Sequence, residues 1–389
     1  MGYILVEDRK TLEKVLAKAS SSPYLSIDIE SNGLYAYRES LCVVQISAQS
    51  VDVVIDSLKV DVSPLKPMLE NPSIEKLFHS GEWDIKMLKT TFDTEVRNIF
   101  DVMIASKYLG FKRCGLDALV KEHFNVDLNK KYQKADWGRR PITQEMLDYA
   151  IKDVKYLYRL RKIFAKELAK KGRLEEIKDE FEKLERLSRL NPAYDPDAFF
   201  SSRQSRGLDP RGLAVLKELF AERDRRAREL DRPAFKVVGD DFLGSLARDP
   251  EQAMKDMTVF RGATEYVLSH HGHWLEDAVS RGLAAPEYKP PRRERRERPE
   301  AGCNFEGSKK RAAALKIWRN AAAEARGMLP ESILNNDMLD RVAQTDPQTL
   351  EDLAKVKGLT KRKITSYGEE ILAELEKHRE SCKPQSPPK

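Results

Sequence analysis

Two segments in the C-terminal half of the 389-residue chain repeat one another. Each has an apolar helical pattern with an arginine, followed by an X-Pro pair, a second apolar pair and an Asp-Pro pair. The corresponding residues are Arg223, Arg232-Pro233, Phe242-Leu243 and Asp249-Pro250 in the first copy, and Arg319, Leu329-Pro330, Met338-Leu339 and Asp346-Pro347 in the second. An ordered match over about 30 residues indicates a duplicated module. We therefore expect two small all-helical domains here.

Breaks in the apolar periodicity set the expected domain boundaries. The pattern is helical from about Thr143, and Asn191-Pro192 and Asp195-Pro196 interrupt it. The stretch 286–302 has no apolar periodicity and contains a run of arginines and glutamates. These breaks predict an N-terminal domain (1–190), a linker (191–208), a first helical domain (209–285), a charged linker (286–304), a second helical domain (305–380) and a disordered tail (381–389).

The first 110 residues mix strand and helix patterns. Residues 26–30 alternate apolar and polar side chains with a period of two, as a half-buried strand does. Further strands are expected at 41–47, 51–55 and 74–79, and helices at 8–19, 82–91, 101–109 and 115–123. Strands with interleaved helices predict an α/β fold for the N-terminal domain.

Composition excludes several classes of protein. No apolar run reaches about 18 residues, so no membrane span is expected, and the N-terminus lacks the pattern of a secretory signal. The four cysteines are scattered without a C-x-x-C pair, which argues against disulfides or zinc and favours a reducing cytoplasm. The net charge of +6 is weak evidence for an acidic partner, but residues 107–140 hold nine basic against four acidic side chains.

Four acidic residues and a tyrosine are the candidate chemical centre. Asp28 and Glu30 lie two apart on a strand, so both leave the same face, and a cation would relieve their repulsion. Asp84 begins a predicted helix, where an acidic residue is more often a simple cap. Tyr149 and Asp153 share one face of a helix, where the alternative is a structural tyrosine–carboxylate hydrogen bond.

Taken in this order and on these elements, the five residues resemble the DEDD exonuclease superfamily in its tyrosine-containing branch, and more closely the ribonuclease D family. The surrounding motifs carry the resemblance: Ile27-Asp28-Ile29-Glu30, Val44-Gln45-Ile46, His79-Ser80-Gly81-Glu82-Trp83-Asp84, Asp101-Val102-Met103, Asp136-Trp137, Arg140-Pro141 and Tyr149-Ala150. Both helical copies resemble the helicase-and-RNase-D C-terminal (HRDC) domain. The resemblance implies a ribonuclease H-like domain, with a mixed sheet covered by helices on both faces, followed by two HRDC-like domains.

The resemblance also implies an activity, namely 3′-to-5′ hydrolysis of RNA with release of nucleoside 5′-monophosphates. Two divalent cations, Mg²⁺ or Mn²⁺, would act, with Asp28, Glu30 and Asp153 binding the first and Asp28 and Asp84 holding the second. Tyr149 would orient the attacking water. The implied partners are tRNA precursors or other structured RNAs with a free 3′ end, and we expect a cytoplasmic monomer. A DNA exonuclease and a catalytically silent RNA-binding scaffold remain alternatives.

Basic side chains in two places are candidates for RNA contacts. Five lie in the basic stretch before the third acidic motif, and four flank Gly358 between two helices of the second module, where a solvated loop is the alternative. Trp137 could stack on a base or belong to the core. The basic candidates are Lys130, Lys131, Lys134, Arg139 and Arg140 in the first place, and Lys357, Lys361, Arg362 and Lys363 in the second.

Overall fold

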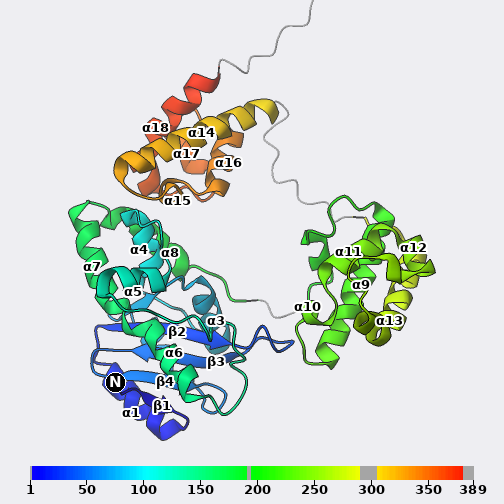
Figure 1. The fold of residues 1–389 in the computed structure, drawn as a ribbon. Coiled ribbons are helices and arrows are strands. Elements are labelled where there is room, and N and C mark those ends of the chain that lie inside the picture. Colours follow the sequence, from blue (N-terminus) through cyan, green and yellow to red (C-terminus); the bar gives the residue numbers. More distant parts are fainter. Residues whose placement is uncertain (1, 191–193, 290–304, 380–389) are drawn as a thin grey trace, which may run out of the picture.

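The computed structural model describes residues 2–190, 194–289 and 305–379 (Figure 1). They form an N-terminal α/β domain and two helical domains, which confirms the predicted fold class. The expected charged linker from residue 290 on, and the tail, fall outside the described residues. Among the described helices, none combines the length and apolar character that crossing a membrane requires.

The N-terminal domain is built on one six-stranded sheet in the order β1-β4-β3-β2-β5-β6. Strands β2, β3 and β4 form an antiparallel meander, whereas β1 pairs with β4, β5 with β2, and β6 with β5 in parallel. The sheet is therefore mixed, as expected. The strands are β1 (Ile4–Val6), β2 (Tyr24–Ser31), β3 (Leu41–Ser47), β4 (Asp52–Asp56), β5 (Glu75–Phe78) and β6 (Ile99–Asp101).

Helices cover both faces of this sheet. Along β2, Ile27 and Ile29 point to the face packed against α1 and α3, so Asp28 and Glu30 point to the opposite face, which α6 covers (Figure 1). Helix α6 begins after Thr143, whose side chain caps the Met146 amide. The helices are α1 (Arg9–Ala19), η1 (Ser63–Leu65), α2 (Lys66–Glu70), α3 (Glu82–Phe92), α4 (Val102–Leu109), α5 (Leu116–Phe124), α6 (Gln144–Lys155), α7 (Leu157–Lys170) and α8 (Leu174–Glu185).

The first helical domain starts earlier in the chain than predicted. Phe199 is buried in its core and its ring lies 5.0 Å from that of Tyr288, so part of the expected 191–208 linker belongs to the fold. The apolar Phe199-Phe200 pair inside this polar stretch is the reason. The elements are η2 (Ala198–Ser201), α9 (Pro210–Glu229), α10 (Ala234–Val237), α11 (Asp240–Arg248), α12 (Pro250–Lys255), η3 (Met257–Val259) and α13 (Glu265–Ala284).

The second helical domain repeats the first. Arg223 of α9 donates a hydrogen bond to the Val238 carbonyl and pairs with Asp240. In the second copy, the buried Arg319 donates to the Leu334 carbonyl (2.8 Å) and to Asn336 (3.0 Å). The same internal bond thus ties the long first helix to the start of a later helix in both copies. The elements are α14 (Phe305–Arg326), α15 (Pro330–Ile333), α16 (Asn336–Thr345), α17 (Leu350–Lys355) and α18 (Lys361–Arg379).

The second helical domain shares a hydrophobic core with the N-terminal domain. Tyr108, at 2% exposure, belongs to the same apolar cluster as residues of α14, α16 and α18. The Leu329 amide donates to the Lys107 carbonyl (3.0 Å). Gly110 has a φ of +88°, and a Cβ there would lie 2.6 Å from the Gly327 carbonyl oxygen. The backbones therefore approach as closely as glycine permits.

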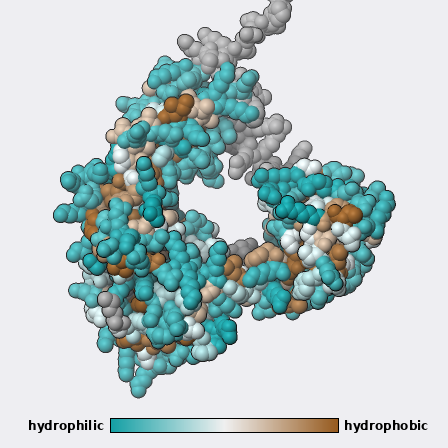
Figure 2. All heavy atoms as spheres, in the orientation of Figure 1, coloured by the Kyte–Doolittle hydropathy of each residue, from teal (hydrophilic) through white to brown (hydrophobic). Residues whose placement is uncertain are grey.

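The first helical domain meets the N-terminal domain through the loop after β2. The Tyr37 hydroxyl donates to Asp224 (2.9 Å), the Tyr37 amide donates to Asp231 (3.1 Å), and Lys236 lies 4.2 Å from the centre of the Tyr35 ring. These contacts are polar and few, unlike the shared core of the second helical domain. Figure 2 shows that the three domains border an open space and have mostly hydrophilic surfaces.

We predict that Lys363 stabilises the docked second helical domain. Its ammonium group, at 3% residual exposure, donates to the Tyr108 hydroxyl (3.2 Å) and the Ile333 carbonyl (3.0 Å), and lies 3.3 Å from Glu180. Lys363→Ala leaves these groups buried without partners, so the free energy of unfolding should fall by at least about 2 kcal/mol. Denaturant unfolding measures the change. The exposed neighbour Lys361→Ala should stay within about 0.5 kcal/mol, and equal effects of both variants would contradict the prediction.

Candidate active site

Three carboxylates from two elements meet at the α6 face of the sheet. Asp28 and Glu30 come from β2, and Asp153 comes from α6, which packs across that face. One oxygen of each lies within 4.8 Å of an oxygen of the others. The predicted strand pair and helix residue are therefore brought together, as hypothesised.

Asp84 reaches the same site from the first turn of α3. The turn before it is tightly constrained: Ser80 has a φ of +60°, and a Cβ on Gly81 would lie 2.5 Å from the Phe78 Cβ. The Gly81 amide donates to the buried Asp101 (2.9 Å), which also caps α4. Asp101 thus fixes the start of α3. Asp101 lies in the Asp101-Val102-Met103 motif, but no sequence pattern predicts this role.

Burial raises the pKa of all four carboxyl groups, and nearby negative charges raise it further for Asp28, Glu30 and Asp84. Burial is the largest cause for Asp28, whose pKa lies well above its usual range, and the charges of Asp84, Asp153 and Glu30 add to it. Burial and the same neighbours raise the pKa of Glu30 to about 9. Burial together with Asp101 raises the pKa of Asp84 to about 8, and burial raises the pKa of Asp153 to about 7 against a hydrogen bond from Tyr149.

Tyr149 stands beside the carboxylates in an aromatic setting. Its ring lies 6.0 Å from that of Tyr132 and 6.1 Å from that of Trp137. Burial raises the pKa of Tyr149 far above 10, and the charges of Asp153, Glu30 and Asp28 act in the same direction. The hydroxyl therefore keeps its proton at neutral pH, so it can orient a water molecule but does not act as a base.

Two adjoining cavities open onto this cluster. The first, of about 390 Å³, is lined by Asp28, Glu30, Tyr149 and Asp153 on one side and by residues of the 115–117 and 128–133 segments on the other. The second, of about 260 Å³, shares Tyr149 and Asp153 with the first and continues along α6 to Lys152. The carboxylates are therefore accessible from solvent through these cavities. Of the lining residues, His79 contacts the Cys114 carbonyl through a ring nitrogen (2.7 Å).

The donor set fits divalent cations. Several carboxylate oxygens at one point are the hard ligands that Mg²⁺ and Mn²⁺ prefer, and positive charge would remove the repulsion that raises their pKa values. The Gln45 side chain, opposite Asp28 on β3, and the Ser26 hydroxyl are buried without hydrogen-bond partners among the described residues. Both remain available to support ligands or bound water.

Comparisons with known proteins agree with this geometry. Residues 3–169 match the family model described as 3′-5′ exonuclease, and residues 212–278 and 308–375 each match the HRDC domain. Ribonuclease D of Zymomonas mobilis is 30% identical over 298 residues, covering 75% of this chain and 76% of its own. The chain belongs to the ribonuclease D family. It is accordingly a metal-dependent 3′-to-5′ exoribonuclease.

Further relatives of the ribonuclease D family extend the match over nearly the whole chain. Ribonuclease D of Gluconacetobacter diazotrophicus is 26% identical over 375 residues, covering 95% of this chain and 92% of its own. The structure of Escherichia coli RNase D matches with a TM-score of 0.71 at 24% identity, covering 99% of this chain and all of the other, which shows the common fold. The catalytic core of RRP6 from Trypanosoma brucei matches with a TM-score of 0.61 at 27% identity, over 72% of this chain and 79% of that one.

The basic candidates near the active site divide into two groups. Lys130 lines the first cavity and pairs with Asp117 (2.9 Å), Lys131 lines the second, and Lys134 and Arg139 are exposed. Arg140 instead binds the fully buried Asp56 and the Cys42 carbonyl (3.0 Å), so its prediction as an RNA contact is wrong. A buried carboxylate needs a partner, and Arg140 supplies it.

Trp137 also belongs to the interior. Its side chain is 1% exposed, and the indole N–H donates to the Tyr132 carbonyl (3.2 Å). The core reading is correct and the stacking reading is wrong. Of the four basic residues around Gly358, Lys357 and Lys361 are exposed.

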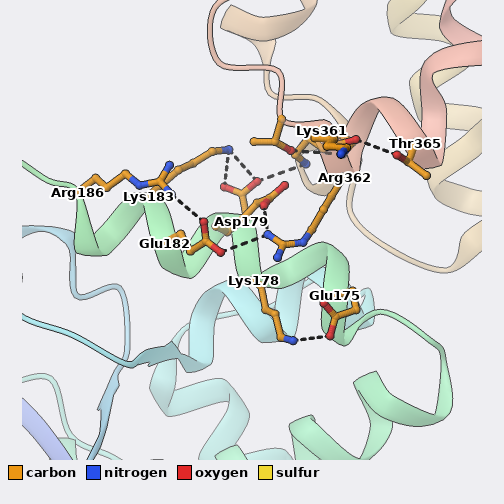
Figure 3. A network of polar contacts seen from close by, with 12 residues as sticks. Glu175, Lys178, Asp179, Glu182, Lys183, Arg186, Lys361, Arg362 and Thr365 are labelled. Carbon is orange, nitrogen blue, oxygen red and sulfur yellow. Dashed lines mark hydrogen bonds and ion pairs between the residues drawn. The ribbon is translucent and has the colours of Figure 1, made fainter. Parts of the chain in front are cut away.

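The other two residues around Gly358, Arg362 and Lys363, hold the second helical domain in place. Arg362 pairs with Asp179 and Glu182 of α8 (Figure 3). Lys363 is buried at the same interface. Burial makes Lys363 a structural residue, whereas Arg362, whose side chain is 36% exposed, stays a predicted RNA contact.

We predict that raising the pH destabilises the protein when a chelator keeps it free of metal. A carboxyl group whose pKa is raised by folding makes its full contribution to the free energy of unfolding below its unfolded pKa of about 4. This contribution is lost as the pH rises through the pKa of the folded state. With Asp153, Asp84 and Glu30 titrating at about 7, 8 and 9, the melting temperature should fall by at least about 2 °C between about pH 6 and pH 9.

Variants separate this effect from other titrations. Glu30→Gln removes one of the raised groups and should make the decline shallower, whereas Glu145→Gln, an exposed change on the same helix as Asp153, should leave it unaltered. Thermal melts followed by circular dichroism provide the measurement. Parallel pH profiles for the wild type and Glu30→Gln would refute the assignment of the effect to this cluster.

Proposed function

We propose that this ribonuclease D relative shortens structured RNAs, including tRNA precursors, from their 3′ ends and releases nucleoside 5′-monophosphates. The observation that carries the proposal is the convergence of Asp28, Glu30 and Asp153 within 4.8 Å at the mouth of a cavity. Asp84 approaches closely enough to raise the pKa of Asp28. In the described part of the chain, no basic side chain forms an ion pair with any of these four carboxylates.

Each acidic residue has a distinct role in this proposal. Asp28, Glu30 and Asp153 would hold one divalent ion, and Asp28 and Asp84 would hold a second, with Mg²⁺ or Mn²⁺ as the ions. Bound cations would supply the positive charge that favours ionisation of water and stabilises the leaving oxygen. Tyr149, protonated and fixed between two rings, orients the attacking water by a hydrogen bond.

Exposed basic side chains guide the RNA to this centre. Lys130 and Lys131 line the two cavities, and Lys134 and Arg139 are exposed on the same segment. In the second helical domain, Lys357, Lys361 and the partly exposed Arg362 remain as phosphate contacts. We further propose that the protein acts as a monomer in the cytoplasm.

The names of relatives support RNA as the substrate. Human exosome complex component 10 is 30% identical over 235 residues, which cover 58% of this chain and 26% of that protein. The Escherichia coli enzyme is described as an exoribonuclease involved in structured RNA processing.

The decisive experiment compares RNA and DNA of one sequence, each labelled at the 5′ or the 3′ end, with purified protein and Mg²⁺. Stepwise shortening of 5′-labelled RNA, with early release of the 3′ label as a mononucleotide, supports the proposal. Preferential shortening of DNA would favour the alternative of a DNA exonuclease. Binding without cleavage of either would favour the silent scaffold.

We predict that Asp28→Asn abolishes nearly all hydrolysis and leaves the fold intact. Asparagine cannot supply the negative charge that holds two cations, so the rate should fall by at least about 1000-fold even at saturating Mg²⁺. Because the substitution removes one repelling charge, the metal-free protein should be at least as stable as the wild type. Turnover close to the wild-type value in a Mg²⁺ titration would overturn the role of Asp28.

We predict that Tyr149→Phe lowers turnover by about 10- to 1000-fold, the range expected for loss of a positioning group. Phenylalanine keeps the ring contacts to Tyr132 and Trp137 and loses only the hydroxyl. The dependence of rate on Mg²⁺ concentration should barely change. If the variant needs a higher Mg²⁺ concentration but reaches normal turnover at saturation, Tyr149 instead supports the metal site.

A further inference from the structure

A row of basic side chains runs along α6 and α7. Tyr156 ends the first helix and begins the second with helical backbone angles (φ −99°, ψ −10°), so the two helices continue one another. Basic residues recur along them every three or four positions, which places them within an arc of roughly 80° over a length of about 27 Å. We call these residues the α6–α7 basic stripe: Lys152, Lys155, Arg159, Lys162, Lys166 and Lys170.

The stripe concentrates the positive charge of the protein. Residues 152–171 hold eight basic and two acidic side chains, an excess equal to the net charge of +6 of the whole chain, so the remainder is balanced. All stripe residues except Lys155 are exposed. The negative end of the α7 dipole accounts for Lys170 in the last turn alone.

Four lysines of the stripe have no carboxylate partner among the described residues. Among the described residues, no ion pair or hydrogen bond engages the side chains of Lys152, Lys166 and Lys170, and Lys162 has only the Tyr158 ring at 5.8 Å. On the next helix, α8, and at its C-cap, each basic residue pairs with a carboxylate of α8. Lys178 pairs with Glu175 and Arg186 with Glu182 (Figure 3), and Lys183 pairs with Glu180. The basic residues of α8 are therefore neutralised by carboxylates of their own helix, whereas the four lysines of the stripe are not.

The two ends of the stripe connect the active site to the second helical domain. Lys152 lines the cavity that contains Tyr149 and Asp153. Beyond Lys170, Arg173 donates hydrogen bonds to the Tyr108 carbonyl (2.7 Å) and to the Arg326 carbonyl of the second helical domain. Halfway along, the Arg159 guanidinium lies 4.1 Å from the centre of the Phe124 ring, which fixes its position.

We propose that the α6–α7 basic stripe binds the phosphate backbone of the RNA segment that lies 5′ of the end held in the active site. The inference rests on the proposed function, since it takes RNA as the substrate. A continuous row of cations that begins at the catalytic cavity follows a polyanion and needs no base contacts. The stripe therefore lets the enzyme retain RNAs of any sequence during successive cleavages.

Two triple variants test the proposal in the full-length chain. The stripe variant carries Lys162→Gln, Lys166→Gln and Lys170→Gln, all distant in sequence from the catalytic residues. The control carries Lys10→Gln, Lys14→Gln and Lys18→Gln, which removes the same charge from an exposed face of α1 in the same domain. Binding is measured with Asp28→Asn added to prevent cleavage, at several salt concentrations, with a single-stranded RNA of about 20 nucleotides.

Loss of three phosphate contacts should lower the slope of log affinity against log salt by about 2 and weaken binding at low salt at least about 10-fold. The control should match the wild type. With Asp28 intact, cleavage of an RNA of about three nucleotides, too short to follow the stripe, should be unchanged in both triple variants. Equal affinities and slopes for the stripe variant and the control would overturn the proposal. Failure of the wild type to shorten any RNA would overturn the proposed function, while the binding comparison still decides the stripe.

Discussion

The structure of this ribonuclease D relative depends on holding four carboxylates together against their own repulsion. Each is raised in pKa by burial, and three are raised further by their neighbours. Regular elements supply the required rigidity: two residues share one strand, Asp153 is fixed by a helix packed across that strand, and the Asp101–Gly81 hydrogen bond fixes the start of the helix that carries Asp84. A flexible loop would let the charges separate. The fold therefore holds the four carboxylates close together, and bound cations would neutralise their charge.

The two helical domains have the same internal bonds but relate differently to the N-terminal domain. The second buries Lys363 against Tyr108 and contributes to a common hydrophobic core. The first touches a single loop through polar contacts such as Tyr37 with Asp224. Burial of apolar area stabilises the position of the second domain, whereas a few exposed hydrogen bonds contribute little to that of the first. The second domain is thus joined to the N-terminal domain by a common core, whereas the first is attached through Tyr35 and Tyr37 of one loop among the described residues.

The sequence predicted what repeats or alternates over a sufficient length. Period-two alternation located β2, and helical periodicity located α1, α3 and α6, which together position the acidic cluster. It missed β1 and β6, because three residues are too few for a pattern to stand out. It could not assign Asp101, whose role depends on a turn 20 residues away. The docking of the second helical domain was also out of reach, since it joins residues more than 150 apart.

The basic residues show most clearly why charge alone does not locate a binding surface. Arg140, Arg362 and Lys363 stand in basic stretches, yet each neutralises a carboxylate that the fold brings near. Residues 152–171 carry a larger net positive charge than either stretch, but their periodicity predicts only the helix that carries Asp153 and its continuation. Four lysines of the stripe, in contrast, have no carboxylate partner among the described residues, a property that only the tertiary structure shows. Where such a row also begins at a catalytic cavity, electrostatic attraction and the path of the substrate coincide.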